Sequence, residues 1–96
     1  MPAVTRKGDA DVPHCSPMVR DEHSPDVFCE GIQISRQGDN NVPHLVPAAV
    51  CPIHAKPIAV GSTTVFVNGR GCGRIGDGIS DCTSVAEGAE TVFAGG

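Results

Sequence analysis

A frame of nine residues occurs three times in this chain and constrains its fold more than any other feature of the sequence. Each copy starts with Arg-x-Gly-Asp and ends, eight residues after the arginine, on a histidine or cysteine. Glycine followed by aspartate favours a tight turn, because the carboxylate accepts backbone N–H groups nearby. A repeat at matched offsets predicts a small threefold object. The copies are residues 6–14, 36–44 and 74–82.

A second unit, Val-Phe-x-x-Gly, precedes two of these frames and also ends the chain. The chain begins, at residues 1–6, with the return strand that would follow that last copy. The repeat is therefore cyclic and is interrupted at one hairpin tip. We expect residues 92–95 to pair antiparallel with residues 3–5 and to close a third hairpin. The copies of this unit are residues 27–31, 65–69 and 92–96.

Local residue pairs predict the other two hairpins. Residues 26–36 alternate apolar and polar side chains around Glu30-Gly31. Residues 63–74 carry Asn68-Gly69 at their centre, the pair favoured in type I′ turns. A helix fits only weakly, near residues 83–90.

Composition predicts an all-β chain, one domain over residues 1–96, with a limited core. Twelve valines and six isoleucines stand against one leucine, and β-branched side chains favour strands. Twelve glycines and eight prolines indicate many turns. A chain with so few large apolar residues usually depends on a metal, on disulfides or on a partner.

Charge and hydropathy argue against several classes of function. A formal charge of −4 leaves no basic patch, so we expect no nucleic-acid partner. No apolar run approaches the ~20 residues of a membrane helix, and the first residues do not form a signal peptide. The five cysteines indicate thiols and ligands more than a disulfide frame. We expect Cys15, Cys29 and Cys72 to be buried thiols, with a Cys15–Cys51 disulfide left open, and His23 to be solvent-exposed.

The ends of the three frames predict a metal site. His14, His44 and Cys82 occupy equivalent positions, so a threefold fold brings them towards one axis. Structural zinc usually takes four ligands, and the long insertion at residues 45–62 carries His54. Three histidines and one cysteine would then hold one structural Zn²⁺, with Cys51 as the alternative fourth ligand. The metal would help to fold a chain with little core.

Enzymatic chemistry is not indicated. No glycine-rich loop leads into a helix, which argues against a phosphate site at the Arg-x-Gly-Asp frames. Serine, histidine and aspartate are present without a nucleophile elbow around them. We therefore expect a non-enzyme, with a small zinc hydrolase as the last-ranked hypothesis.

Repeated Gly-Asp turns, short hairpins, Pro-His before two of the loops and the three-His-one-Cys set together resemble the PAAR-repeat proteins. The resemblance covers essentially the whole chain; residues 1–6 keep Pro, Ala and Arg of the signature with a changed interior. It implies a conical all-β fold of three pseudo-threefold hairpins. It also implies a structural zinc near the point, bound by His14, His44, His54 and Cys82.

The resemblance further implies a spike tip of a bacterial type VI secretion system or of a contractile phage tail. The partner would be a trimeric β-helical spike protein, capped by one copy of this chain per three spike chains, with transient contact to the target membrane. The protein would then belong to a virion tail, or to the bacterial cytoplasm before secretion. Docking would use the hairpin face around Phe28, Phe66 and Phe93. The alternative is a free zinc-stabilised adaptor that tethers effector cargo.

Overall fold

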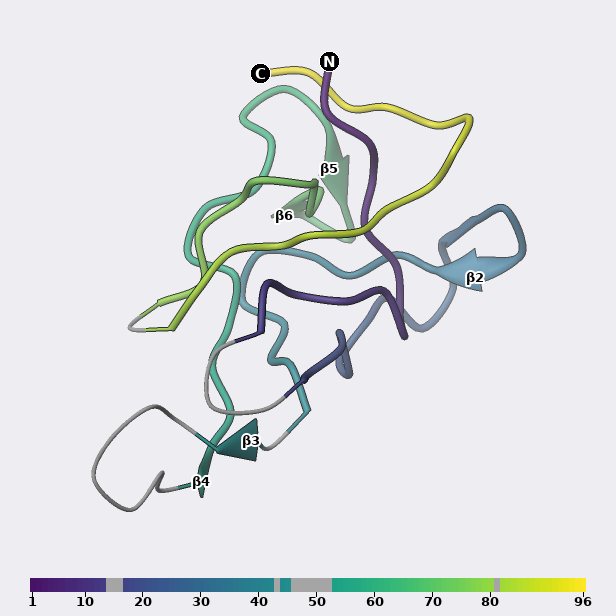
Figure 1. The fold of residues 1–96 in the computed structure, drawn as a ribbon. Coiled ribbons are helices and arrows are strands. Elements are labelled where there is room, and N and C mark those ends of the chain that lie inside the picture. The colour runs from purple at the N-terminus through teal and green to yellow at the C-terminus, as the bar shows by residue number, and fades with distance from the viewer. Residues whose placement is uncertain (14–16, 43, 46–52, 81) are drawn as a thin grey trace.

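Short antiparallel hairpins make up the regular structure of this protein (Figure 1). The computed structural model describes residues 1–13, 17–42, 44–45, 53–80 and 82–96. Within those ranges there is no helix, and hence none long and apolar enough to cross a membrane. The all-β prediction is confirmed. The paired strands are β1 (Phe28–Cys29) with β2 (Ile32–Gln33), β3 (His44–Leu45) with β4 (Ile53–His54), and β5 (Phe66–Val67) with β6 (Arg70–Gly71).

The tips of the β1–β2 and β5–β6 hairpins have the backbone conformation that their residues predict. Glu30 and Gly31 have φ angles of 54° and 81°, and Asn68 and Gly69 have φ angles of 53° and 79°. Positive φ at both central residues is the mark of a type I′ turn, whose twist matches that of the flanking strands. Both predicted hairpins are therefore confirmed.

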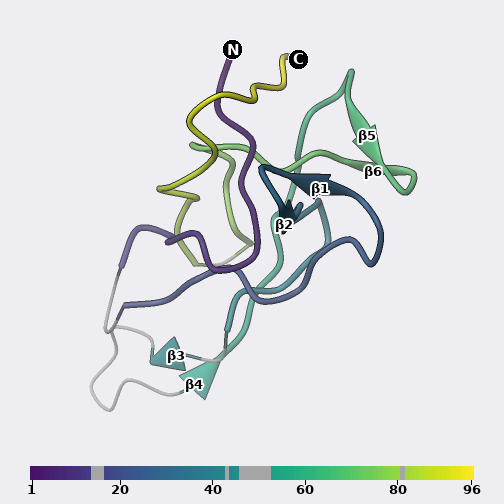
Figure 2. The same cartoon turned by 90° about the vertical axis from the view of Figure 1, so that its right-hand side faces the viewer.

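The two chain ends form the third hairpin. Ala3 pairs antiparallel with Phe93, and Ala94 N–H donates to the carbonyl of Pro2 at 3.0 Å. Gly96 has a φ of 83°, close to the values at the other two tip glycines. The termini accordingly lie side by side (Figures 1 and 2). The predicted cyclic closure is confirmed.

A ring of backbone hydrogen bonds joins the three repeats at their centre. Ser35 N–H donates to Thr5 O at 3.1 Å, Thr5 N–H to Gly73 O at 3.0 Å, and Gly73 N–H to Ser35 O at 3.0 Å. Each residue directly precedes the arginine of its Arg-x-Gly-Asp frame. The closed ring shows that the repeat in sequence is a threefold repeat in space.

Gly73 leaves no room for a side chain in this ring, which makes a prediction possible. A Cβ atom there would lie 2.5 Å from Ser35 O and 2.9 Å from the Thr5 and Ile58 side chains. Gly73→Ala should therefore destabilise the protein by about 3 kcal/mol, the upper part of the usual range for overpacking.

The control is Gly78→Ala, because nothing lies within 4 Å of a Cβ atom at Gly78. Urea denaturation of the two variants measures the difference. If the two substitutions destabilise the protein equally, close packing at the ring is not the cause of the destabilisation.

The Arg-x-Gly-Asp frames form three copies of one ion-paired turn. In each, the aspartate carboxylate accepts hydrogen bonds from the backbone N–H of the arginine, at 2.8–2.9 Å, and from its guanidinium on two nitrogens. The glycine between them has a φ of 87–88° in all copies, a conformation that favours glycine. The pairs are Arg6–Asp9, Arg36–Asp39 and Arg74–Asp77.

The same arginines also hold the hairpin tips. Nη1 of each arginine donates to the residue before the tip glycine of a different repeat. This arrangement links the three hairpins into a closed circuit, so that no hairpin depends on its own strands alone. The contacts join Arg6 to Glu30 at 2.8 Å, Arg36 to Asn68 at 3.1 Å and Arg74 to Gly95 at 3.0 Å.

Among the described residues, the apolar core is divided into two clusters. The larger lies among the three hairpins, and most of its members are sets of equivalent residues from the repeats. Burial raises the pKa of the Cys72 thiol in this cluster to about 11, and Cys29 is buried as well, as predicted. The larger cluster contains Val4, Cys29, Ile34, Val67, Cys72, Ala89 and Ala94, and the smaller one Ile58, Ile79 and Val85.

Candidate functional site

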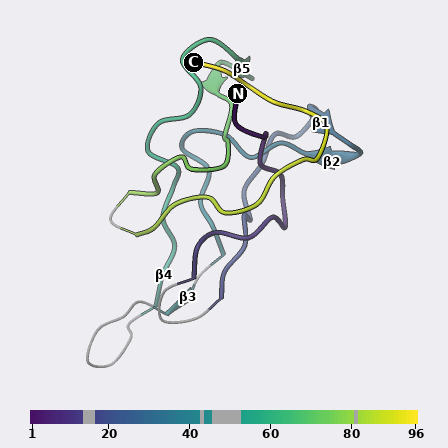
Figure 3. The same cartoon turned by 45° about the horizontal axis from the view of Figure 1, so that its top comes forward.

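The two ends of the molecule are built from different strand pairs. The β1–β2 hairpin, the β5–β6 hairpin and the paired termini share one half, which we call the base, and β3–β4 lies at the opposite end (Figures 1 to 3). The protein measures 39 Å along its longest axis against 23 and 21 Å across. Two of the predicted metal ligands lie at the end opposite the base.

These two ligands, His44 and His54, are register partners across the β3–β4 pair. Residues directly opposite each other in an antiparallel ladder have Cα atoms about 4.5 to 5.5 Å apart. The structure thus pairs the end of the second frame with a residue of the long insertion. His14 and the alternative ligand Cys51 lie outside the described residues.

Cys82, the fourth predicted ligand, packs partly buried against the smaller apolar cluster. Its backbone N–H donates to Ile79 O at 3.1 Å, and its sulfur lies 3.9 Å from Asn41 Nδ2. Burial raises the pKa of the Cys82 thiol, and the hydrogen bond from Asn41 acts in the opposite direction. Among the described side chains, no three from His, Cys, Asp and Glu surround one point.

A buried ion pair next to Cys82 was not predicted from the sequence. Arg20 and Asp11 are joined at 3.0 Å, and both side chains have 0% exposure. The guanidinium also donates to Asp39 O at 2.6 Å and to Ser35 Oγ at 3.3 Å. Asn41 donates to the same Asp11 carboxylate oxygen at 3.2 Å. We call Asp11, Arg20 and Asn41 the polar layer.

The repeat contained a partial signal for this layer. Asp11 and Asn41 stand at the same offset in their frames, where the third frame has Ile79. All are buried, so the position is an interior one in every repeat. Arg20 had no such signal, because it lies in a loop whose length differs between repeats.

The base exposes the aromatic side chains that the repeat places in equivalent positions. Phe28, Phe66 and Phe93 are 55%, 60% and 49% exposed. Each stands in the first strand of its hairpin, two residues before the residue that an arginine holds. The neighbouring Val65 and Val92 are exposed as well. The base therefore carries a threefold set of unburied apolar groups.

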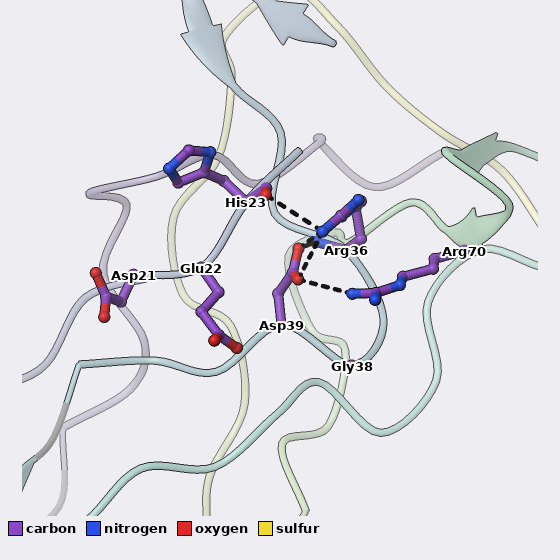
Figure 4. A pocket seen from close by; sticks show the side chains of 7 residues that line it. All are labelled: Asp21, Glu22, His23, Arg36, Gly38, Asp39 and Arg70. Carbon is purple, nitrogen blue, oxygen red and sulfur yellow. Dashed lines mark hydrogen bonds and ion pairs between the residues drawn. The ribbon is translucent and has the colours of Figure 1, made fainter. Parts of the chain in front are cut away.

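A polar surface pocket lies at the second Arg-x-Gly-Asp turn (Figure 4). Its charges are largely paired: Asp39 binds Arg36, and it also binds Arg70 at 3.1 Å. The Glu22 carboxylate accepts the Asn40 N–H at 2.7 Å. These residues stabilise the turn and include none of the predicted metal ligands.

His23, at the edge of that pocket, corrects one expectation. It was predicted to be solvent-exposed, but it is half-buried, with Nδ1 2.7 Å from Ser24 O. Its own carbonyl accepts a hydrogen bond from Arg36 at 3.2 Å. The prediction was wrong because loop residues 17–26 pack along the second turn, which their charge and proline content did not indicate.

No protein-family model matches this chain, and no curated protein sequence is significantly similar to it. The function is therefore inferred from the repeat itself and from three features of the molecule. These are the base, the paired histidines of β3–β4 and the polar layer beside Cys82.

Proposed function

We propose that this chain is the tip of a contractile injection machine. It caps the trimeric β-helical spike of a phage tail or type VI secretion system and sharpens it for piercing the target envelope. The observation that carries the proposal is the threefold set of exposed phenylalanines on a closed base. Exposed apolar groups that recur by symmetry mark an interaction surface better than scattered ones do.

A threefold base on a single chain suits a homotrimeric partner. Each repeat can face an equivalent surface on one spike subunit, although the repeats differ in sequence. Closed self-association through the same face is less favourable, because the loops of the repeats differ in length. The stoichiometry that follows is one copy of this chain per three spike chains.

We further propose that one structural zinc holds together the end opposite the base. The register pairing of His44 with His54 supports this, and so does the position of Cys82 at the end of the third frame. Imidazole nitrogen and thiolate sulfur are the ligands that structural zinc prefers. With His14 they would complete a four-coordinate site, in which the metal would supply a cross-link between the repeats and no reactive position.

The docking proposal predicts the effect of charge on the base. Phe28→Glu, Phe66→Glu or Phe93→Glu should each weaken binding to the trimeric spike protein from the same genome at least about tenfold, or about 1.4 kcal/mol. The control is Val12→Glu, since Val12 is also exposed but lies outside the hairpins. Native mass spectrometry would give the ratio and titration calorimetry the affinity.

Two results would contradict this model: a complex with three tip chains per trimer, or equal binding by all four variants. Failure of the unmodified chain to bind any trimeric spike would instead favour the adaptor function.

The zinc proposal predicts about one zinc per chain in protein purified without added metal. Removal with a strong chelator should lower the Tm by about 10 °C or more. Structural zinc contributes several kcal/mol, and a domain of this size loses about 4–8 °C for each kcal/mol. Cys82→Ser should abolish zinc retention, whereas His23→Ala should leave it intact. Unchanged Tm after chelation would rule out a structural metal.

A further inference from the structure

The side chain of Asn41 is fully buried and uses both ends of its amide. Its Oδ1 accepts the backbone N–H of Lys56 at 2.9 Å. Its Nδ2 donates to Asp11 Oδ2 at 3.2 Å and faces Cys82 Sγ at 3.9 Å and Met18 Sδ at 3.6 Å. The amide therefore directs an N–H group towards sulfur.

This orientation is fixed from both sides. A flipped amide would place its NH₂ group against the Lys56 N–H and its oxygen against the Asp11 carboxylate, leaving buried donors and acceptors unpaired. Asp11 is in turn held by Arg20, and Arg20 donates to Ser35 Oγ beside the central ring. A continuous series of polar contacts thus connects the ring to the neighbourhood of Cys82.

Packing alone does not require an amide at this position. The third frame places Ile79 at the equivalent site, where it is buried in the smaller apolar cluster. A branched apolar side chain is thus compatible with the fold at this offset. The amide at Asn41 instead accepts the Lys56 N–H through its oxygen and directs its NH₂ group towards Asp11 and two sulfur atoms.

We propose that Asn41 is a positioning residue for Cys82, aiming the sulfur at the metal through an N–H···S hydrogen bond. This inference rests on the proposed zinc site. A donor to a metal-bound thiolate reduces the charge that the sulfur places on the metal and limits the directions in which the side chain can point. Groups that orient metal ligands typically change metal affinity about 10- to 100-fold when they are removed.

The test uses Co²⁺ as the probe in the full chain. Asn41→Leu keeps the number and branching of the side-chain heavy atoms and removes the donor. Asn41→Ser also removes the amide N–H from sulfur, because its side chain is shorter. The space it leaves can hold a water molecule that donates to Asp11, so this variant serves if the leucine variant fails to fold. In both variants the affinity for Co²⁺ should fall about 10- to 100-fold. The thiolate-to-cobalt charge-transfer band should move to longer wavelength, because a thiolate without its hydrogen bond is a better electron donor.

Ile34→Val is the matched control for a purely structural effect. It should lower the thermal stability through the larger apolar cluster without moving the band or the affinity for Co²⁺. If the unmodified chain shows the thiolate band and the Asn41 variants keep its position and the affinity, the positioning role is wrong while the metal site stands. If the unmodified chain shows no thiolate band, both the proposed site and this inference are overturned.

Discussion

Replacing Asp11 by isoleucine should lower the free energy of unfolding by about 3–5 kcal/mol, the usual cost of breaking a buried ion pair by removing one partner. The substitution leaves the Arg20 guanidinium without its carboxylate at a site where its side chain has 0% exposure. The remaining acceptors, Asp39 O and Ser35 Oγ, carry no net charge. Urea denaturation followed by circular dichroism measures the loss.

The double variant Asp11→Ile/Arg20→Ile provides the control. Ile79 occupies the position equivalent to Asp11, and Ile58 and Val85 form the same backbone contacts as Arg20 in the other two repeats. Replacing a whole buried pair by apolar side chains is often neutral. The double variant should therefore recover most of the stability. If it is as unstable as Asp11→Ile alone, the unpaired charge of Arg20 is not the cause of the lost stability.

Deletion of residues 91–96 should unfold the protein rather than shorten a tail. The deleted segment pairs Phe93 with Ala3 and places Ala94, 1% exposed, in the larger apolar cluster. Its Gly95 carbonyl accepts hydrogen bonds from Arg74 and Ser62. The deletion opens the cyclic arrangement at one hairpin, and the remaining core is too small to compensate. Loss of the cooperative thermal transition is the expected result.

Removal of Met1 alone is the matched truncation, and it should leave stability unchanged because this residue is 87% exposed. A backbone-cyclised chain that lacks Met1 and joins Gly96 to Pro2 should gain about 2–4 kcal/mol, since closing a long loop restricts the unfolded chain. A truncated chain that keeps its full thermal transition would contradict the cyclic fold. So would a cyclised chain that loses stability.

Much of the architecture follows from the sequence because the repeated residues act locally. Asn68-Gly69 and Glu30-Gly31 set the positive φ angles of their own turns, and Gly38 does so in its Arg-x-Gly-Asp frame. Matched offsets also predicted that the termini would pair, since Phe93 recurs in a unit whose return strand stands at the start of the chain. The equivalence of the exposed phenylalanines came from the same pattern.

The tertiary structure alone decided how the repeats contact one another. Loops of unequal length hide the equivalence of Arg20, Ile58 and Val85, so the sequence showed no reason for a charged residue in the interior. Asp11 supplies that reason, because a buried guanidinium is tolerated where a carboxylate pairs with it. The clamping of each hairpin tip by an arginine of another repeat is likewise a long-range contact. The sequence determined the three repeated hairpins and their cyclic order, whereas the β3–β4 pair and the burial and ion pairing of distant residues required the folded chain.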